Sequence, residues 1–380
     1  MPAFEVLEPA IDPNNRISFL LDWELTMKCN LDCSYCSSGL YGGHDNSTKH
    51  PPKDECIQAL EFMFEYVDQY MQYKPKGLRY VVLNVYGGES LHHPNIIEIL
   101  SLIQEKYRPY SSSWHLTVTT TTNAIVANKK LQKIIPYIDE FTVSYHCEST
   151  EKQKTQFKEN LLTIKQSEKR LKCIVMMHNN SKYFQDSVDF LSWLATNEIN
   201  SLPKQIDNRN TLVSRPYDQQ KITWFNELYQ SKTYGVADNI DPVSNESKDL
   251  TQIGRACCGG RQSCLDQNYK QRQYYVLDNR FTNWYCSVNQ FFLFVKQVNG
   301  EVYVNKDCKM TFEETVGPIG NLSDTGAIIN KLKQQMINGQ PVIQCKKEKC
   351  LCGMCAPKAK NLDTYNSIMK KYQKETVCDT

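Results

Sequence analysis

The sequence contains no apolar run approaching the roughly 18 to 20 residues that a membrane-spanning helix requires. It also has little net charge, because 44 Lys and Arg against 42 Asp and Glu leave +2. A balanced chain creates no global field that attracts nucleic acid or a membrane surface, so neither is an expected partner. Internal repeats and low-complexity tracts are absent, and 41% hydrophobic with 23% charged residues is a globular composition.

The N-terminal segment lacks an apolar signal region and carries Glu5, Glu8 and Asp12, so we expect a cytoplasmic protein. Cysteine, in contrast, is abundant, with 16 residues in a chain of 380. In a reducing compartment such thiols are free to bind metal or to carry out redox chemistry. Isolated cysteines such as Cys56, Cys147 and Cys173 are expected to be small buried hydrophobic residues instead.

Strand-like and helix-like patterns alternate between residues 16 and 210. We expect strands at 17–25, 80–86, 116–122, 141–145, 173–177 and about 205–207, with amphipathic helices between them. Thr150 and Gln153 predict a capping box at the start of one of these helices. Repeated βα units imply parallel strands with right-handed crossovers, and about six of them curl towards a barrel. The sequence therefore predicts an α/β fold with a partial (βα)6 TIM-like barrel.

Polar residues follow each of the first four expected strands. Cys29 follows the first, Gly87-Gly88-Glu89 the second, Thr122-Asn123 the third, and Ser144 to His146 the fourth. Barrel enzymes carry their chemistry at these C-terminal strand ends, so we expect the four features to meet at one site. The adjacent pair His92-His93 is expected to face solvent.

A second domain is expected after the barrel. Residues 236–256 are rich in Asp, Asn and Ser and are typical of a linker, and Asn299-Gly300 between two apolar runs predicts a hairpin with a two-residue turn. We divide the chain into an N-terminal extension (1–15), a core (16–235), the linker, a small cysteine-rich β-hairpin/α domain (257–360) and a helical tail (361–380).

The first cysteine cluster is Cys29-x3-Cys33-x2-Cys36. Random placement of the chain's cysteines would produce this triplet only about 0.03 times per chain. A cubane of four irons normally takes four cysteine ligands, so three thiolates leave one iron open to another ligand. Zinc is the alternative metal, although zinc sites usually pair two Cys-x2-Cys motifs.

With Tyr35 as the aromatic residue before Cys36, the motif and the Gly-Gly-Glu at 87–89 resemble the radical S-adenosylmethionine (radical SAM) superfamily over residues 16–210. The resemblance implies a [4Fe–4S] cluster on Cys29, Cys33 and Cys36 that binds S-adenosylmethionine (AdoMet) at its open iron. It implies an enzyme that cleaves AdoMet reductively to a 5′-deoxyadenosyl radical, which abstracts hydrogen from a substrate.

The same resemblance assigns roles to residues around the cluster. Tyr35 would pack near the adenine. Gly87 and Gly88 would allow the backbone to approach the methionine amino group, with Glu89 close behind.

Residues on the next two strands would contact the ribose or the methionine carboxylate. These are Thr122, Asn123 and Ser144. Many relatives have an acidic residue two positions after that serine, where this chain has His146, which we also place at the cofactor.

The later cysteines resemble the auxiliary-cluster domains called SPASM or twitch. The candidate ligands are Cys286, Cys308, Cys345, Cys350, Cys352 and Cys355. We expect one auxiliary [4Fe–4S] cluster on Cys308, Cys350 and Cys352, with a fourth ligand from the other three. A further site that uses Cys257, Cys258 and Cys264 stays open, as does a structural zinc in place of iron.

The expected partners are a peptide or small-molecule substrate and a reductant such as flavodoxin or ferredoxin. The alternative function is that of a redox sensor or binding protein that holds an iron–sulfur cluster or zinc without turnover.

Overall fold

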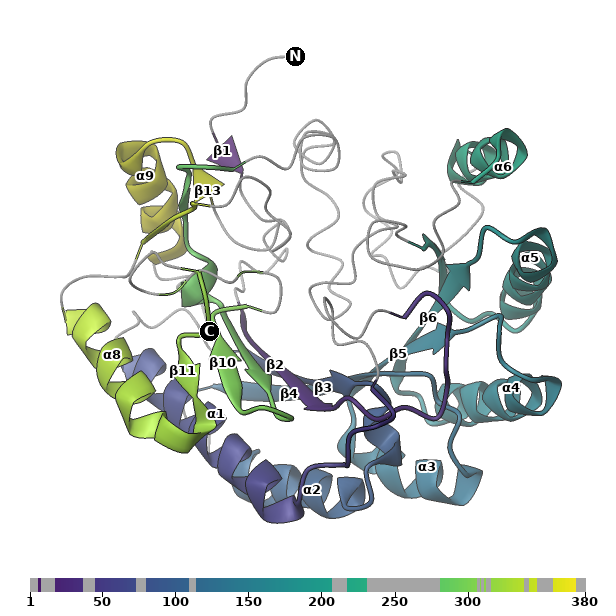
Figure 1. Ribbon diagram of the computed structural model, residues 1–380, viewed down its shortest axis with the longest axis horizontal. Helices are drawn as coiled ribbons and strands as arrows, with labels where there is room; N and C mark the ends of the chain where they lie inside the picture. Colours follow the sequence, from purple (N-terminus) through teal and green to yellow (C-terminus); the bar gives the residue numbers. More distant parts are fainter. Residues whose placement is uncertain are drawn as a thin grey trace, which may run out of the picture.

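The structure is a computed structural model, and it describes residues 6–7, 18–36, 45–72, 80–108, 114–206, 217–230, 281–305, 308, 311, 316–337, 342–346 and 358–373. A strongly curved sheet forms its centre, with helices on the outer side of the curve (Figure 1). The cysteines at 257, 258, 264, 350, 352 and 355 lie outside the described residues.

The nine-stranded sheet has the order β11-β10-β9-β2-β3-β4-β5-β6-β7. Its six parallel core strands are β2 (Ser18–Thr26), β3 (Tyr80–Gly87), β4 (His115–Thr122), β5 (Glu140–Tyr145), β6 (Arg170–Met177) and β7 (Ser201–Gln205). Each pairs with the next in chain order, which confirms the predicted parallel βα array. Within the described part of the chain, β7 and β11 are edge strands, so the sheet is open.

The outer helices of this array are α1 (Lys53–Gln72), α2 (Ile96–Leu102), α3 (Asn128–Ile134), α4 (Glu151–Gln166), α5 (Ser181–Thr196) and α6 (Gln219–Gln230). Short 3₁₀ helices lie at Ser90–His92 (η1) and Ile135–Tyr137 (η3). Helix α2 continues into a π-helix, η2, over Ile103–Tyr107, and helix α3 tightens into η3 at its end. Pro136 accounts for the second change, because it lacks the N–H that an α-helix interior needs.

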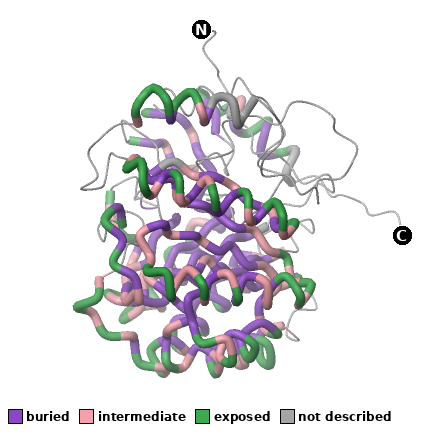
Figure 2. Tube along the Cα trace, turned by 90° about the vertical axis from the view of Figure 1, so that its right-hand side faces the viewer, coloured by how far each residue is buried: buried purple, intermediate pink, exposed green. Residues whose placement is uncertain are grey.

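Strand β2 has two different faces because successive side chains point to opposite sides of a sheet. Phe19, Leu21 and Trp23 are fully buried, as expected for the face under the outer helices. The other face carries carboxylates: Asp22 is 2% exposed and accepts from Asn84 Nδ2 at 2.9 Å. This face of β2 therefore holds a buried carboxylate beside a buried amide, and Figure 2 shows buried segments gathered in the middle of the molecule.

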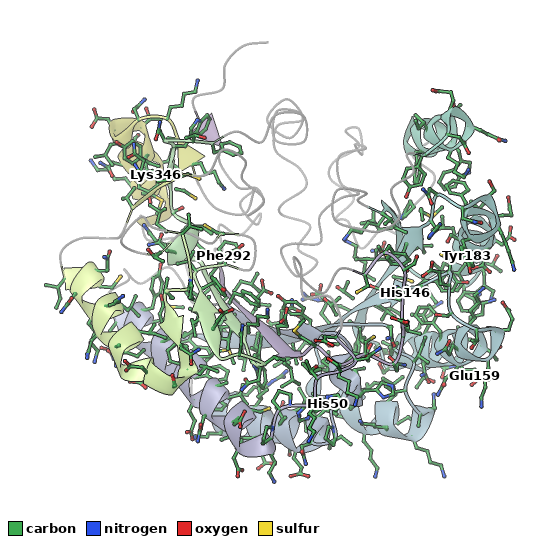
Figure 3. All side chains as sticks on the ribbon, in the orientation of Figure 1. His50, His146, Glu159, Tyr183, Phe292 and Lys346 are labelled. Carbon is green, nitrogen blue, oxygen red and sulfur yellow. The ribbon has the colours of Figure 1, made fainter. Side chains whose placement is uncertain are left out.

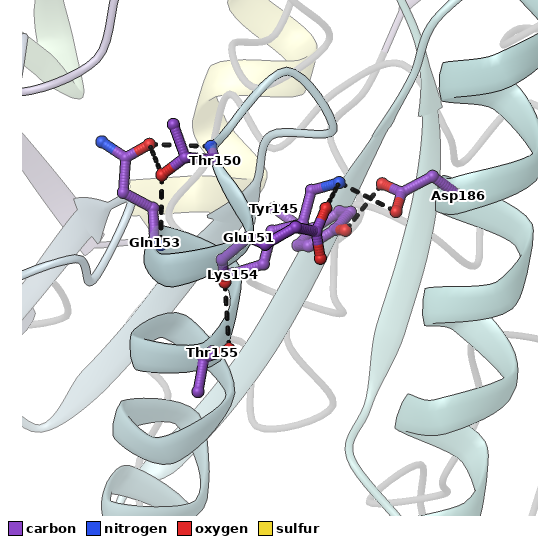
Figure 4. Close-up of polar contacts among 7 residues, drawn as sticks. All are labelled: Tyr145, Thr150, Glu151, Gln153, Lys154, Thr155 and Asp186. Carbon is purple, nitrogen blue, oxygen red and sulfur yellow. Dashed lines mark hydrogen bonds and ion pairs between the residues drawn. The ribbon is translucent and has the colours of Figure 1, made fainter.

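Helix α4 begins with the predicted capping box. The Thr150 hydroxyl accepts from the Gln153 N–H, and the Gln153 side chain accepts from the Thr150 N–H at 2.9 Å. Lys154 of the same helix contacts Asp186 on α5 at 2.9 Å, and the Tyr145 hydroxyl donates to that carboxylate at 2.7 Å (Figure 4). These contacts fix α4 and α5 to the C-terminal end of β5.

The C-terminal hairpin joins the core sheet. Strand β9 (Phe292–Lys296) pairs in parallel with β2, and β10 (Glu301–Tyr303) and β11 (Gly320–Asn321) extend the sheet beyond it. Long-range pairing places the hairpin that was expected around Asn299-Gly300 beside β2. Its turn spans four residues, 297–300, instead of the two predicted, with Gly300 in the left-handed region at φ +69°.

The remaining elements form a smaller, four-stranded sheet of order β1-β13-β8-β12. Its strands are β1 (Val6–Leu7), β8 (Tyr285–Cys286), β12 (Ile343–Gln344) and β13 (Lys358–Ala359). Short 3₁₀ helices lie at Val288–Gln290 (η7) and Leu322–Asp324 (η8), helix α8 (Thr325–Ile337) packs on α1, and α9 (Leu362–Gln373) is the helix expected in the tail. No helix in the described ranges combines the length and hydropathy required to cross a membrane.

Candidate functional site

Backbone hydrogen bonds join the loop that carries the first cysteine cluster to the C-terminal end of β3. Gly88 N–H donates to the Thr26 carbonyl at 2.7 Å, and Glu89 N–H donates to the Lys28 carbonyl at 2.9 Å. A Cβ on Gly87 would lie 2.0 Å from the Thr26 oxygen, and one on Gly88 would lie 2.4 Å from the Met27 oxygen. The two glycines therefore let the backbone before Cys29 run directly against β3.

Glu89 is fully buried and accepts three hydrogen bonds. Its Oε1 accepts from the Thr122 hydroxyl at 2.6 Å and from Leu91 N–H at 3.0 Å, and its Oε2 accepts from Asn123 N–H at 2.6 Å. Burial raises the pKa of this carboxyl, while the hydrogen bonds from Thr122 and Asn123 lower it in part. The carboxylate caps η1 and ties the end of β3 to the end of β4.

Asn123 continues this connection to the cysteine loop. Its Nδ2 lies 2.8 Å from Asn30 Oδ1 and 3.7 Å from Cys29 Sγ. Asn30 in turn donates to the Ile125 carbonyl at 3.0 Å. Glu89, Asn123 and Cys29 therefore form one chain of contacts across three strand ends.

The second cysteine of the cluster is held from β5. Cys33 Sγ lies 3.4 Å from His146 Nδ1, and the Tyr35 hydroxyl lies 2.7 Å from the same nitrogen. The rings of Tyr35 and His146 stack with their centroids 5.9 Å apart. Figure 3 marks His146 near β5 and β6. The structure thus brings together the predicted residues Cys33, Tyr35 and His146.

Two residues that the sequence did not single out complete this attachment. Glu148 accepts from Ser34 N–H at 2.7 Å and from the Ser34 hydroxyl at 2.5 Å. His178, on the loop after β6, lies 3.5 Å from Glu148 and presents its ring edge to Tyr35. No local pattern marks Glu148 or His178, because their role depends on a neighbour more than 100 positions away.

Two other predicted site residues, Ser144 and Thr122, make their described contacts to residues other than the cluster cysteines. Ser144 lies on β5 beside Ile174 of β6, two residues before His146. Thr122 directs its hydroxyl to Glu89. His93, expected to face solvent, is fully buried, with its Nε2 2.9 Å from the Pro51 carbonyl, so that expectation is wrong.

No protein-family model and no curated protein sequence matches the chain. Solved structures do match its fold. One is described as native anSMEcpe with bound AdoMet and Cp18Cys peptide, at 11% identity and a TM-score of 0.46 over 84% of this chain and 82% of that one. Another, with AdoMet and a Kp18Cys peptide, has 13% identity and a TM-score of 0.47 over 94% and 96%. A crystal structure of methylornithine synthase (PylB) matches at 14% identity and a TM-score of 0.35 over 54% and 58%.

Two of these structures are described with bound AdoMet and a peptide, and their likeness to this chain concerns the fold alone. At these identities and TM-scores, its chemistry has to be argued from its own residues.

The cluster expected from the sequence motif requires three thiols, and Cys29, Cys33 and Cys36 lie on one short loop. Cys36 interacts electrostatically with both Cys29 and Cys33. Burial raises the pKa of Cys29 to about 12 and also raises that of Cys33, so thiolates here need a nearby positive charge such as a metal supplies.

A single zinc is the alternative occupant of this loop. Four sulfurs at about 2.3 Å from one zinc lie about 3.8 Å apart. In the part of the chain that the structure describes, no three His, Cys, Asp or Glu side chains come close enough to hold one metal ion. In a polynuclear cluster each thiolate binds a different iron, so such a cluster does not require the three sulfurs to meet at one metal ion.

Three of the predicted auxiliary cysteines are described. Cys286 lies on β8, the strand between β12 and β13, and Cys345 directly follows β12. Backbone bonds from Asn283 to Cys345 and from Cys345 to Trp284 hold these two cysteine segments side by side. The Cys308 N–H donates to Asn305 Oδ1 at 3.3 Å. All three side chains are buried.

The isolated cysteines have the expected environment. Cys56, Cys147 and Cys173 are fully buried, and burial raises the pKa of Cys56 and Cys147 to about 12. These thiols are uncharged core side chains and serve as matched controls for the cluster cysteines.

Proposed function

We propose that this protein is a radical SAM enzyme whose catalytic [4Fe–4S] cluster is held by Cys29, Cys33 and Cys36. The observation that carries the proposal is the gathering of these three thiols on one loop, between contacts from β3 and β4 on one side and from β5 on the other. When bound, such a cluster supplies the electron that cleaves AdoMet reductively.

The chain's own residues hold and shield this position. Asn123 and Asn30 fix the side of the loop at Cys29, while His146 and Glu148 fix the side at Cys33 and Ser34. Cys33 and Tyr35 are 8% and 7% exposed, which keeps water and solvent thiols away from this part of the site. We also propose that Tyr35 packs near the adenine of AdoMet and that Ser144 contacts its ribose or its methionine carboxylate.

The substrate is proposed to be a peptide or a small molecule with an unactivated C–H bond. Two matched structures contain a bound peptide, so peptides are the first substrates to test. We further propose flavodoxin or ferredoxin as the reductant and a cytoplasmic location, where abundant thiols stay reduced.

We also propose one auxiliary [4Fe–4S] cluster in the C-terminal part. Cys286, Cys308 and Cys345 are its described candidate ligands, and the others are Cys350, Cys352 and Cys355. A structural zinc is the competing occupant. Iron and sulfide analysis of the anaerobically reconstituted protein separates about four irons per chain from about eight, and zinc analysis of the same sample tests the alternative.

The function is tested by reducing the reconstituted protein with dithionite in the presence of AdoMet. An enzyme releases 5′-deoxyadenosine, whereas a sensor that binds clusters without turnover releases none. Replacing Cys29, Cys33 and Cys36 by Ala should abolish the release and remove about four irons. Cys173→Ala, in the core of β6, is the matched control and should retain both. Deuterium exchange between deoxyadenosine and candidate compounds then identifies the substrate.

A further inference from the structure

The backbone that leads into Cys29 bonds to two different parts of the chain. The end of β3 holds it through the backbone hydrogen bonds described above. Other groups of the same stretch bond to residues 45–48. The Met27 carbonyl accepts from the Asp45 N–H at 2.7 Å, and the Cys29 N–H donates to Asn46 Oδ1 at 2.9 Å. Segment 45–48 is therefore a second support for the start of the cysteine loop.

This segment is a tight turn that is closed by its own hydrogen bonds. Asp45 Oδ1 accepts from the Ser47 N–H at 2.9 Å and from the Ser47 hydroxyl at 2.5 Å. The Asp45 carbonyl accepts from the Thr48 N–H at 3.2 Å and from the Thr48 hydroxyl at 2.7 Å. Asn46 lies inside this turn and directs its amide to the cysteine loop. The turn thus holds the Asn46 backbone while the side chain bonds outward.

The Asn46 amide bridges the two residues that flank Asn30. Its Oδ1 accepts from the Cys29 N–H, and its Nδ2 lies 3.5 Å from the Leu31 carbonyl. Between these two ends, the Leu31 N–H lies 3.4 Å from Cys29 Sγ. Asn30 itself bonds to Asn123 at 2.8 Å. Two asparagine amides from distant positions therefore fix three consecutive residues, and the direction of the Cys29 side chain follows from that backbone.

We propose that Asn46 is a positioning residue that orders the backbone at Cys29 and Leu31 before any metal is bound. A ligand that is already ordered loses less conformational entropy when it binds a cluster. Asn46 is exposed, so water competes for its hydrogen bonds, and its loss should weaken iron retention about two- to tenfold without unfolding the protein. The proposal rests on the proposed function, because it requires a cluster on Cys29.

Two measurements test this role. The first is amide hydrogen exchange at Cys29 in the metal-free, reduced protein, resolved by mass spectrometry with fragmentation. The second is the rate at which the reconstituted protein loses iron to a chelator, corrected for a variant with Ala at all three cluster cysteines. Asn46→Leu removes both contacts at similar size, and Asn46→Asp keeps an oxygen that accepts from Cys29. Ser47→Ala is the matched control, since it belongs to the same turn and its hydroxyl bonds to Asp45.

We expect Asn46→Leu to exchange the Cys29 amide and to lose iron about two- to tenfold faster than wild type. Asn46→Asp and Ser47→Ala should stay near wild type in both measurements. Unchanged exchange at Cys29 in Asn46→Leu, faster exchange without faster iron loss, or an equal effect of Ser47→Ala would each overturn the role of Asn46 and leave the proposed function intact. If the wild-type protein binds no iron at the three cysteines, the proposed function itself fails.

Discussion

Removing the Glu89 carboxylate should destabilise the protein before any ligand is bound. The side chain is fully buried and accepts hydrogen bonds from Thr122, Asn123 and Leu91. In Glu89→Gln, one carboxylate oxygen becomes an NH₂ group, which cannot accept. If the remaining oxygen keeps Thr122 and Leu91, the N–H of Asn123 faces another donor. A buried donor without an acceptor costs about 1–3 kcal/mol.

Glu89→Ala removes all three acceptor contacts and should cost at least about 3 kcal/mol. Because Asn123 also contacts Asn30 and Cys29, both variants should retain less iron after reconstitution. The measurements are denaturant unfolding of the metal-free protein under anaerobic conditions and iron content per chain. Glu98→Gln is the control: Glu98 contacts Lys53 at the surface, so its loss should change the free energy of unfolding by no more than about 0.5 kcal/mol.

The opposite result would identify Glu89 as a ligand-binding group. If Glu89→Gln is as stable as wild type and holds full iron but no longer binds AdoMet, the carboxylate contacts the cofactor and does not brace the strand ends. That outcome would refute the reasoning from the three hydrogen bonds. It would support the role that the family resemblance assigns to Glu89.

Three further predictions use the same unfolding assay. Gly88→Ala should lower stability and iron retention, because the added Cβ would lie 2.4 Å from a backbone oxygen. Gly326→Ala in α8, where a Cβ meets open space, should raise the free energy of unfolding by up to about 1 kcal/mol. Equal effects of the two substitutions would contradict this reasoning. Burial lowers the pKa of His50 to about 4, so the free energy of unfolding should decrease as the pH falls from about 6.5 to 4. His50→Gln should weaken this pH dependence, and a variant with the wild-type pH profile would show that His50 is not its source. Gln297→Leu should cost about 1–3 kcal/mol by leaving the buried Trp23 N–H without its acceptor, and a neutral result would place the hairpin turn away from β2.

The repeating part of the fold could be predicted from the sequence because its signals are local. Apolar periodicity located the first five core strands and the helices between them, and Thr150 with Gln153 marked a helix start that the structure contains. The sixth strand, expected at about 205–207, lies earlier, at Ser201–Gln205. Local signals failed where pairing is distant. The parallel contact of β9 with β2 joins residues about 270 positions apart, and nothing in 292–296 specifies that neighbour.

In the candidate site, too, the sequence indicated only the residues that belong to a local pattern. Cys29, Cys33 and Cys36 could be singled out from their spacing, Tyr35 from its place in the cysteine motif, and His146 from its position at a strand end. Ser34 and Glu148 could not, because a serine and a glutamate on two loops show no pattern until the loops meet. The contacts that attach the cysteine loop at Ser34 therefore come from residues outside the cysteine motif.

The Gly-Gly-Glu segment illustrates why a motif and its physical cause must be separated. Family resemblance assigns Gly87 and Gly88 to the approach of a methionine amino group, yet both are already required by the backbone of residues 26–28. Gly87 has φ +143°, and its Cβ would lie 2.0 Å from a carbonyl oxygen, so a larger residue would displace the strand that leads to Cys29 even without ligand. The glycines therefore explain how the cysteine loop is positioned, and the argument for AdoMet chemistry depends on the three thiols themselves.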